Sequence, residues 1–129
     1  MLREFETQVR VRYDEADPMG MVHHANFFRY FELGRTEMLR ATGGSYRKME
    51  AAGLLIVVVK ANVSFRRPAR YDDLLTIRTK VREFGHAKIE HEYVILRDEE
   101  LLTEATVTLA VLDRDGNVQR VPDWLRDSV

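Results

Sequence analysis

Apolar and polar residues alternate along the first segment of the chain. In FETQVRVRY, residues 5–13, the positions Phe5, Val9, Val11 and Tyr13 are separated by polar neighbours. A period of two places alternate side chains on opposite faces of an extended chain, as in a strand with one buried face. The sequence therefore predicts a β-strand over residues 5–13.

The spacing of apolar positions becomes helical after residue 23. Steps of four and three residues separate the members of one stripe, which are Phe27, Phe31, Gly34, Met38 and Ala41. The pattern predicts a long helix from about His24 to Leu39, which ATGGS then stops. A glycine inside a helix costs about 1 kcal/mol relative to alanine, so we expect another backbone to pass close to Gly34. A short second helix over residues 45–52 is predicted, with Ser45 as its N-cap.

Alternation returns after residue 53 and continues almost to the end of the chain. Turn-forming sequences separate four apolar segments, which cover residues 54–65, 74–84, 87–97 and 102–113. One strand, one apolar helix and a run of strands with short turns is an α+β pattern. With no repeat or linker, we expect a single domain over residues 1–129.

The amino-acid composition of the chain excludes several classes of function. The formal net charge of −1 does not favour nucleic acid or an anionic membrane as a partner. The longest apolar run, LLIVVV at residues 54–59, is far too short to span a membrane, so a cytoplasmic protein is expected. The absence of cysteine excludes disulfides, thiolate zinc sites and a cysteine nucleophile. No serine lies in a G-x-S-x-G elbow, and no glycine-rich phosphate loop is present.

Candidate chemistry is concentrated in YDEADPMGMVHHANFF, residues 13–28. Asp17 opens DPMG, which is a type I turn signature, and by itself this favours a structural aspartate. We interpret Asp14 and Glu15 as solvated turn residues. Two adjacent histidines, His23 and His24, near Asp17 are donor types that metals use, but adjacent residues rarely bind one ion, so no metal is expected.

The stretch YDEADPMGMVHHANFFRYFELGRTEMLR resembles the signature of hotdog-fold acyl-CoA thioesterases. In particular, it is similar to the 4-hydroxybenzoyl-CoA thioesterase family and its Tol–Pal-associated branch, and VSFRRPARYDDLLTI extends the similarity. The resemblance implies an α+β hotdog fold, in which a curved antiparallel sheet of about five strands wraps a long central helix. It also implies hydrolysis of acyl-CoA to the free acid and coenzyme A, without a cofactor.

The resemblance assigns roles within the motif. Asp17 matches the family's catalytic carboxylate, which acts either as a nucleophile or as a general base. His24 matches the histidine at the helix entrance, where its backbone N–H or its imidazole would polarise the thioester carbonyl. Glu32 and Glu37 on the helix are the reserve candidates if Asp17 is inert, and Glu32 is spaced to form an ion pair with Arg35.

Other residues are candidates for binding the substrate. Those in the motif are Tyr13, His23 and Asn26, although His23 replaces an aromatic residue that is usual in the family. Coenzyme A carries phosphates, which require positive groups at the mouth of the site. The candidates for that role are Lys60, Arg66, Arg67, His86 and Lys88.

The sequence also predicts that the chain assembles with copies of itself, and it leaves two alternative functions open. A helix that is apolar nearly all round and a sheet with free edges both favour a symmetric homodimer or homotetramer. The resemblance places the active sites of such an assembly at the dimer interface. The alternatives are a non-catalytic acyl-CoA-binding hotdog domain and a hotdog dehydratase or hydratase. The sequence does not indicate the length or chemistry of the acyl group.

Overall fold

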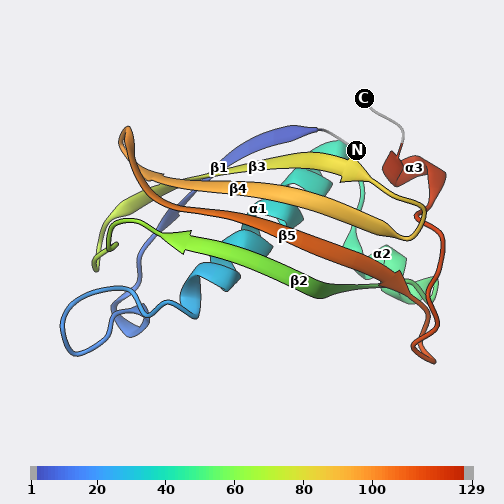
Figure 1. Ribbon diagram of the computed structural model, residues 1–129, viewed down its shortest axis with the longest axis horizontal. Helices are drawn as coiled ribbons and strands as arrows, with labels where there is room; N and C mark the ends of the chain where they lie inside the picture. Colours follow the sequence, from blue (N-terminus) through green and yellow to red (C-terminus); the bar gives the residue numbers. More distant parts are fainter. Residues whose placement is uncertain (1–2, 127–129) are drawn as a thin grey trace.

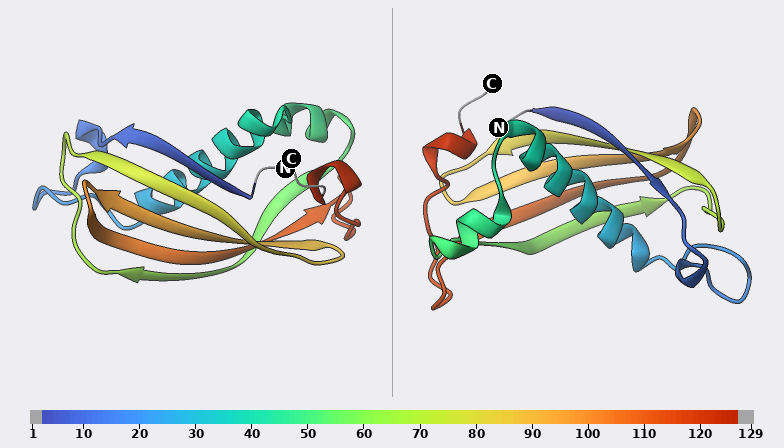
Figure 2. Two further views of the ribbon diagram at one scale, coloured as in Figure 1. Left: turned by 90° about the horizontal axis from the view of Figure 1, so that it is seen from above. Right: turned by 180° about the vertical axis from the view of Figure 1, so that it is seen from behind.

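Five antiparallel strands form one sheet in this computed structural model, which describes residues 3–126. The strands follow the order β1-β3-β4-β5-β2 and comprise β1 (Glu4–Arg10), β2 (Leu55–Phe65), β3 (Leu74–Phe84), β4 (Lys88–Arg97) and β5 (Glu100–Leu112). The sheet curves around the long helix α1 (Asn26–Thr42), as Figures 1 and 2 show. This arrangement confirms the predicted α+β hotdog architecture. The ends of the predicted domain, residues 1–2 and 127–129, lie outside the described residues.

The first strand is shorter than its alternating pattern predicts. β1 ends at Arg10, and residues Tyr13–Glu15 form a short 3-10 turn, η1. Val11 is still buried, and its N–H donates to the carbonyl of Asp73 at 2.9 Å. The alternation therefore extends one residue beyond the strand, because Val11 packs inward after regular pairing with β3 has ended.

The helices begin and end close to their predicted positions. α1 ends at Thr42 and is capped by Gly43, whose φ of 98° is a left-handed conformation that glycine adopts readily. α2 (Tyr46–Ala51) follows, and the hydroxyl of Ser45 accepts a hydrogen bond from the N–H of Lys48 at 3.4 Å, which confirms the predicted cap. A short α3 (Asp123–Arg126) lies near the end of the chain. No helix within residues 3–126 is long and apolar enough to cross a membrane.

The inner face of α1 packs against the concave face of the sheet. The predicted stripe is buried at Phe27, Phe31, Gly34 and Met38, but Ala41 is exposed. The helix is also less uniformly buried than predicted, since Phe28 is 42% exposed. α1 therefore has one buried face and one open face.

Gly34 allows α1 to approach β3 closely. A β-carbon at this position would lie 2.4 Å from Oγ1 of Thr79 and 2.8 Å from Cγ2 of Ile77. Both distances are far below van der Waals contact. The expected close approach is confirmed, although the neighbours are side chains of β3 rather than its backbone.

Gly34→Ala should therefore destabilise the fold, even though alanine favours helix more than glycine does. We expect a loss of about 1–3 kcal/mol in the free energy of unfolding, as overpacking of a filled core typically costs. Urea titration measures it. Adding Thr79→Ala, which removes the closest atom, should recover part of the loss, whereas a stable single variant would contradict the packing argument.

Candidate active site

Residues 16–22 form a small hairpin ahead of α1. Ala16 pairs with Val22 in an isolated antiparallel bridge, and Met21 pairs with Arg70, which follows β2. The N–H of Gly20 donates to the carbonyl of Asp17 at 2.9 Å, so DPMG forms the turn that its sequence predicts. These bridges hold the hairpin against the rest of the domain at its base.

The carboxylate of Asp17 is held by one of its two oxygens. Oδ1 accepts hydrogen bonds from the N–H groups of Met19 at 2.9 Å and Met21 at 3.1 Å. Oδ2 has no hydrogen-bond partner within residues 3–126. The turn therefore orients the carboxylate and leaves one oxygen available to a water molecule or a substrate, so the structural and chemical roles of Asp17 are compatible.

The backbone at the entrance of α1 leaves one donor unused. The N–H of Ala25 donates to Nδ1 of His23 at 3.2 Å, and those of Asn26 and Phe27 donate to the carbonyls of His23 and His24. The N–H of His24 has no partner in the described part of the chain. A free N–H at the positive end of a helix is suited to stabilise a developing oxyanion.

A cavity of about 290 Å³ brings these groups together. Asp17, His23 and His24 line it from the hairpin and the helix entrance, and Phe27 and Phe65 form an apolar wall. The ring of His24 stacks on that of His23, with centroids 4.2 Å apart, and meets the ring of Phe65 edge-on at 6.3 Å. The cavity thus joins a carboxylate, two imidazoles and an apolar surface.

Two of the predicted phosphate ligands lie at the same cavity. Arg66 and Arg67 follow β2 and line the cavity beside Pro68. Each is exposed and paired with an acid of β5, Arg66 with Glu104 at 2.5 Å and Arg67 with Glu100 at 3.7 Å. Exposed ion pairs contribute only about 0–1 kcal/mol, so either arginine can exchange its partner for a phosphate.

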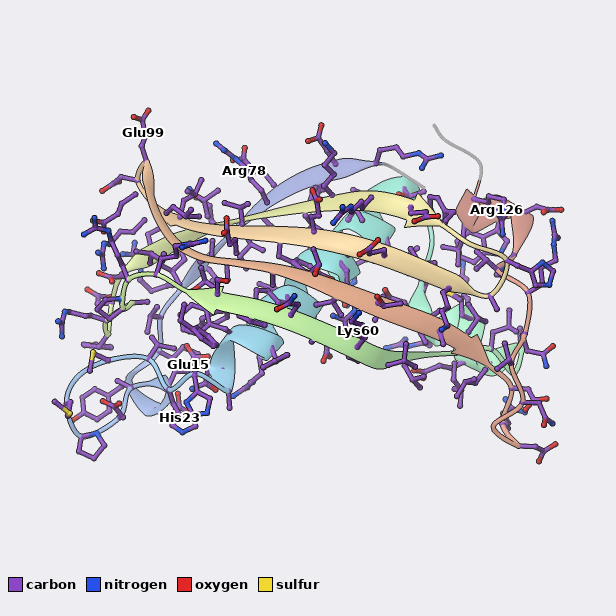
Figure 3. All side chains as sticks on the ribbon, in the orientation of Figure 1. Glu15, His23, Lys60, Arg78, Glu99 and Arg126 are labelled. Carbon is purple, nitrogen blue, oxygen red and sulfur yellow. The ribbon has the colours of Figure 1, made fainter. Side chains whose placement is uncertain are left out.

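The other predicted binding residues do not line this cavity. Tyr13 is 81% exposed and packs on Tyr71, while Asn26 donates its side-chain N–H to the carbonyl of Glu15 at 2.9 Å. Lys60 pairs with Thr108, which alternates with buried residues of β5, so its side chain lies on the outer face of the sheet (Figure 3). The remaining two, His86 and Lys88, precede or begin β4 at the opposite end of the sheet from the hairpin (Figure 1).

Glu15 is buried, contrary to its interpretation as a solvated turn residue. Its Oε1 accepts hydrogen bonds from the N–H of Arg12 at 2.7 Å and the hydroxyl of Tyr30 at 3.0 Å, and only 6% of the residue is exposed. Its carbonyl accepts from the N–H of His23 and the side chain of Asn26. Glu15 therefore joins η1, the hairpin and α1. The available signal was Tyr30, because a buried tyrosine hydroxyl needs a partner.

The reserve acids on α1 are not at this cavity. Glu37 pairs with Arg40, and the predicted ion pair between Glu32 and Arg35 is not formed. Glu32 and Arg35 instead line a second cavity between α1, α2 and the start of β2. Their separation leaves the guanidinium of Arg35 without an ion-pair partner within residues 3–126.

The family model and the three known proteins described below, which match this chain in sequence or structure, are named as thioesterases. The thioesterase-like superfamily matches residues 11–129. Acyl-CoA thioesterase YbgC of Haemophilus influenzae is 36% identical over 110 residues, which cover 84% of this chain and 81% of that protein. The structure named "Probable Thioesterase" from Bartonella henselae has a TM-score of 0.89 at 35% identity and covers 92% of this chain and 99% of its own. DHNA-CoA thioesterase from Staphylococcus aureus has a TM-score of 0.90 at 27% identity, with coverages of 98% and 88%.

These matches extend over nearly the whole chain and confirm the resemblance found in the helix-entrance motif. They include both the hairpin that carries Asp17 and the strands that follow β2. The chain belongs to the thioesterase-like superfamily.

Proposed function

We propose that this protein hydrolyses acyl-CoA thioesters to the free acid and coenzyme A. The observation that carries the proposal is one cavity lined by both Asp17 and His24. Within residues 3–126, Oδ2 of Asp17 and the N–H of His24 have no hydrogen-bond partner. The N–H of His24 and its imidazole polarise the thioester carbonyl. Asp17 then attacks the carbonyl, forming a mixed anhydride that water cleaves, or it deprotonates the attacking water.

The leaving group needs little assistance from the protein. A thiol has a pKa of about 8.5, so the departing thiolate of coenzyme A is far more stable than an alkoxide and takes its proton from solvent. Arg66 and Arg67 lie at the same cavity and are placed to bind phosphates of coenzyme A. Glu15 acts indirectly, because its hydrogen bonds hold the hairpin of Asp17 against α1.

Asp17→Asn tests the carboxylate. The amide oxygen can still accept the hydrogen bonds from Met19 and Met21, so the melting temperature should change little. The kcat should fall by at least about 100-fold, because a base or nucleophile is lost. Release of free thiol from a panel of aliphatic and aromatic acyl-CoAs measures it.

Asp14→Asn is the matched control, because Asp14 is exposed and does not line the cavity. It should keep wild-type turnover. If Asp17→Asn also kept it, the catalytic acid would have to be sought at Glu32 or Glu37. Failure of the wild-type protein to release thiol from any acyl-CoA would refute the function itself.

His24→Ala separates the backbone donor from the imidazole. The variant keeps the N–H, because every non-proline residue supplies one. We expect kcat to fall by about 10- to 1,000-fold, as loss of a polarising side-chain donor does. His24→Gln, which keeps a side-chain donor, should recover part of the rate. Unchanged turnover in His24→Ala would leave only the backbone N–H in the mechanism.

We also propose that two copies pair through β2. Within residues 3–126 this strand pairs only with β5, and its outer edge is open. Three large apolar residues are exposed along it, with Val58 at 48%, Val59 at 51% and Phe65 at 50%. An exposed apolar edge strand normally requires a partner, and a two-fold axis provides one from the same chain.

Val59→Lys should weaken this pairing. Val59 lies near the middle of β2, so a two-fold axis would place the new lysine close to its own copy. Light scattering at micromolar concentration should give at least twice the mass of one chain for the wild type. The mass of the variant should shift toward a single chain. A monomeric wild type would disprove the assembly.

A further inference from the structure

His23 lies at the start of α1, and its backbone is held on both sides (Figure 3). Its N–H donates to the carbonyl of Glu15 at 3.0 Å, and its carbonyl accepts from the N–H of Asn26 at 2.9 Å. Glu15 is fixed in turn by the hydroxyl of Tyr30. Burial and the nearby carboxylate of Glu15 raise the pKa of Tyr30, so the hydroxyl keeps the proton that it donates. The backbone therefore sets the position of His23, and its ring is left to make contacts of its own.

The imidazole of His23 caps the start of the helix. Its Nδ1 accepts a hydrogen bond from the N–H of Ala25 at 3.2 Å, and Ala25, the N-cap residue of α1, makes no side-chain cap itself. An imidazole nitrogen that accepts a hydrogen bond carries no proton, so the proton of the neutral ring lies on Nε2. A proton added at Nδ1 would turn the acceptor into a donor and break the cap. The contact therefore selects the neutral ring in one tautomer.

The same ring contacts the imidazole of His24. The two rings stack with centroids 4.2 Å apart and planes inclined by 29°, and the ring of Phe65 meets His24 edge-on at 6.3 Å. His24 is exposed, and no hydrogen bond reaches its imidazole from the described residues. Contacts with His23 and Phe65 therefore set the orientation of this ring.

The charged groups around the stack do not replace these contacts. Asp17, Arg66 and Arg67 line the same cavity as the two histidines. Asp17 is held by backbone N–H groups of its own turn, and the two arginines pair with acids of β5. Within residues 3–126, none of the three forms a hydrogen bond or an ion pair with either imidazole.

We propose that His23 is a positioning residue for thioester hydrolysis, and that its neutral imidazole, anchored on the N–H of Ala25, holds the ring of His24 in the orientation that polarises the carbonyl. The inference rests on the thioesterase function proposed above. Of the two imidazoles, only that of His24 touches the substrate, and His23 acts through it. Reacting groups must be held within about 0.5 Å of the productive geometry, so a His24 ring that rotates freely loses much of its effect.

His23→Ala removes both contacts of the ring. We expect kcat to fall about 10-fold while KM changes by less than about 2-fold, because a polarising group acts mainly in the transition state. The melting temperature should fall only slightly, because the ring is exposed. Thiol release from the acyl-CoA panel measures both kinetic constants. A kcat equal to that of the wild type would overturn the inference.

Two further substitutions separate the cap from the stack. In His23→Asn, the side-chain oxygen stands as far along the side chain as Nδ1 and can accept from the N–H two residues later, but no ring remains to stack. In His23→Phe, the ring remains and the acceptor is lost. Each variant should have a kcat about 2- to 5-fold above that of His23→Ala, because each keeps one of the two contacts. If neither exceeded His23→Ala, the inference would fail.

A double-mutant cycle tests whether His23 acts through His24. When two residues act as one unit, the effects of their substitutions are not additive. In a His24→Ala background, His23→Ala should change kcat by less than about 2-fold, because the ring that it positions is gone. A second loss of about 10-fold in this background would show that His23 acts independently of His24, and the proposal would be wrong.

NMR of the histidine side chains tests the geometry without turnover. At neutral pH, Nδ1 of His23 should carry no proton. The ring resonances of His24 should shift in His23→Ala, whereas those of His86, near the far end of the sheet, should not. A proton on Nδ1 of His23, or unshifted resonances of His24, would overturn the inference. A wild type that hydrolyses no acyl-CoA would instead refute the thioesterase function, and with it the role of His23 in hydrolysis, even where the spectra confirm the contacts.

Discussion

The close packing of α1 against β3 is the contact on which the rest of the structure depends. At Gly34 there is no room for a side chain, because Thr79 and Ile77 occupy the space that a β-carbon would need. This contact brings Phe31 onto Tyr93, with ring centroids 4.8 Å apart, and buries one face of the helix. The glycine therefore permits the close approach of the helix to the sheet.

The position of the helix in turn determines the position of the candidate active site. The entrance of α1 carries the N–H of His24, which is unpaired within residues 3–126, and Tyr30 in its second turn donates to the buried carboxylate of Glu15. Through Glu15, the hairpin is tied to the helix, and the hairpin orients Asp17 through hydrogen bonds to a single carboxylate oxygen. The helix, the buried acid and the turn therefore act as one rigid support for the reacting groups.

The same packing leaves two features incomplete within one chain. Polar atoms of Thr79, His91 and Tyr93 are buried under α1 without partners in the described residues, and the outer edge of β2 is unpaired. Each would be destabilising if it remained so. The proposed pairing of β2 with a second copy would cover the edge.

The sequence by itself determined the class of the fold, the order of its elements, the turn at Asp17, the end of α1 and the N-cap of α2. These features depend on local periodicity and on short turn and capping patterns, which are readable along the chain. Its motif also identified the cavity residues Asp17, His23 and His24, and the two arginines after β2. Only the tertiary structure decided that Glu15 is buried and that Lys60 lies on the outer face. It also decided that His86 and Lys88 lie at the far end of the sheet, and that Arg35 forms no ion pair with Glu32. Those outcomes depend on register, strand order and the rotation of α1, which are set by contacts between residues far apart in the sequence and leave no local pattern.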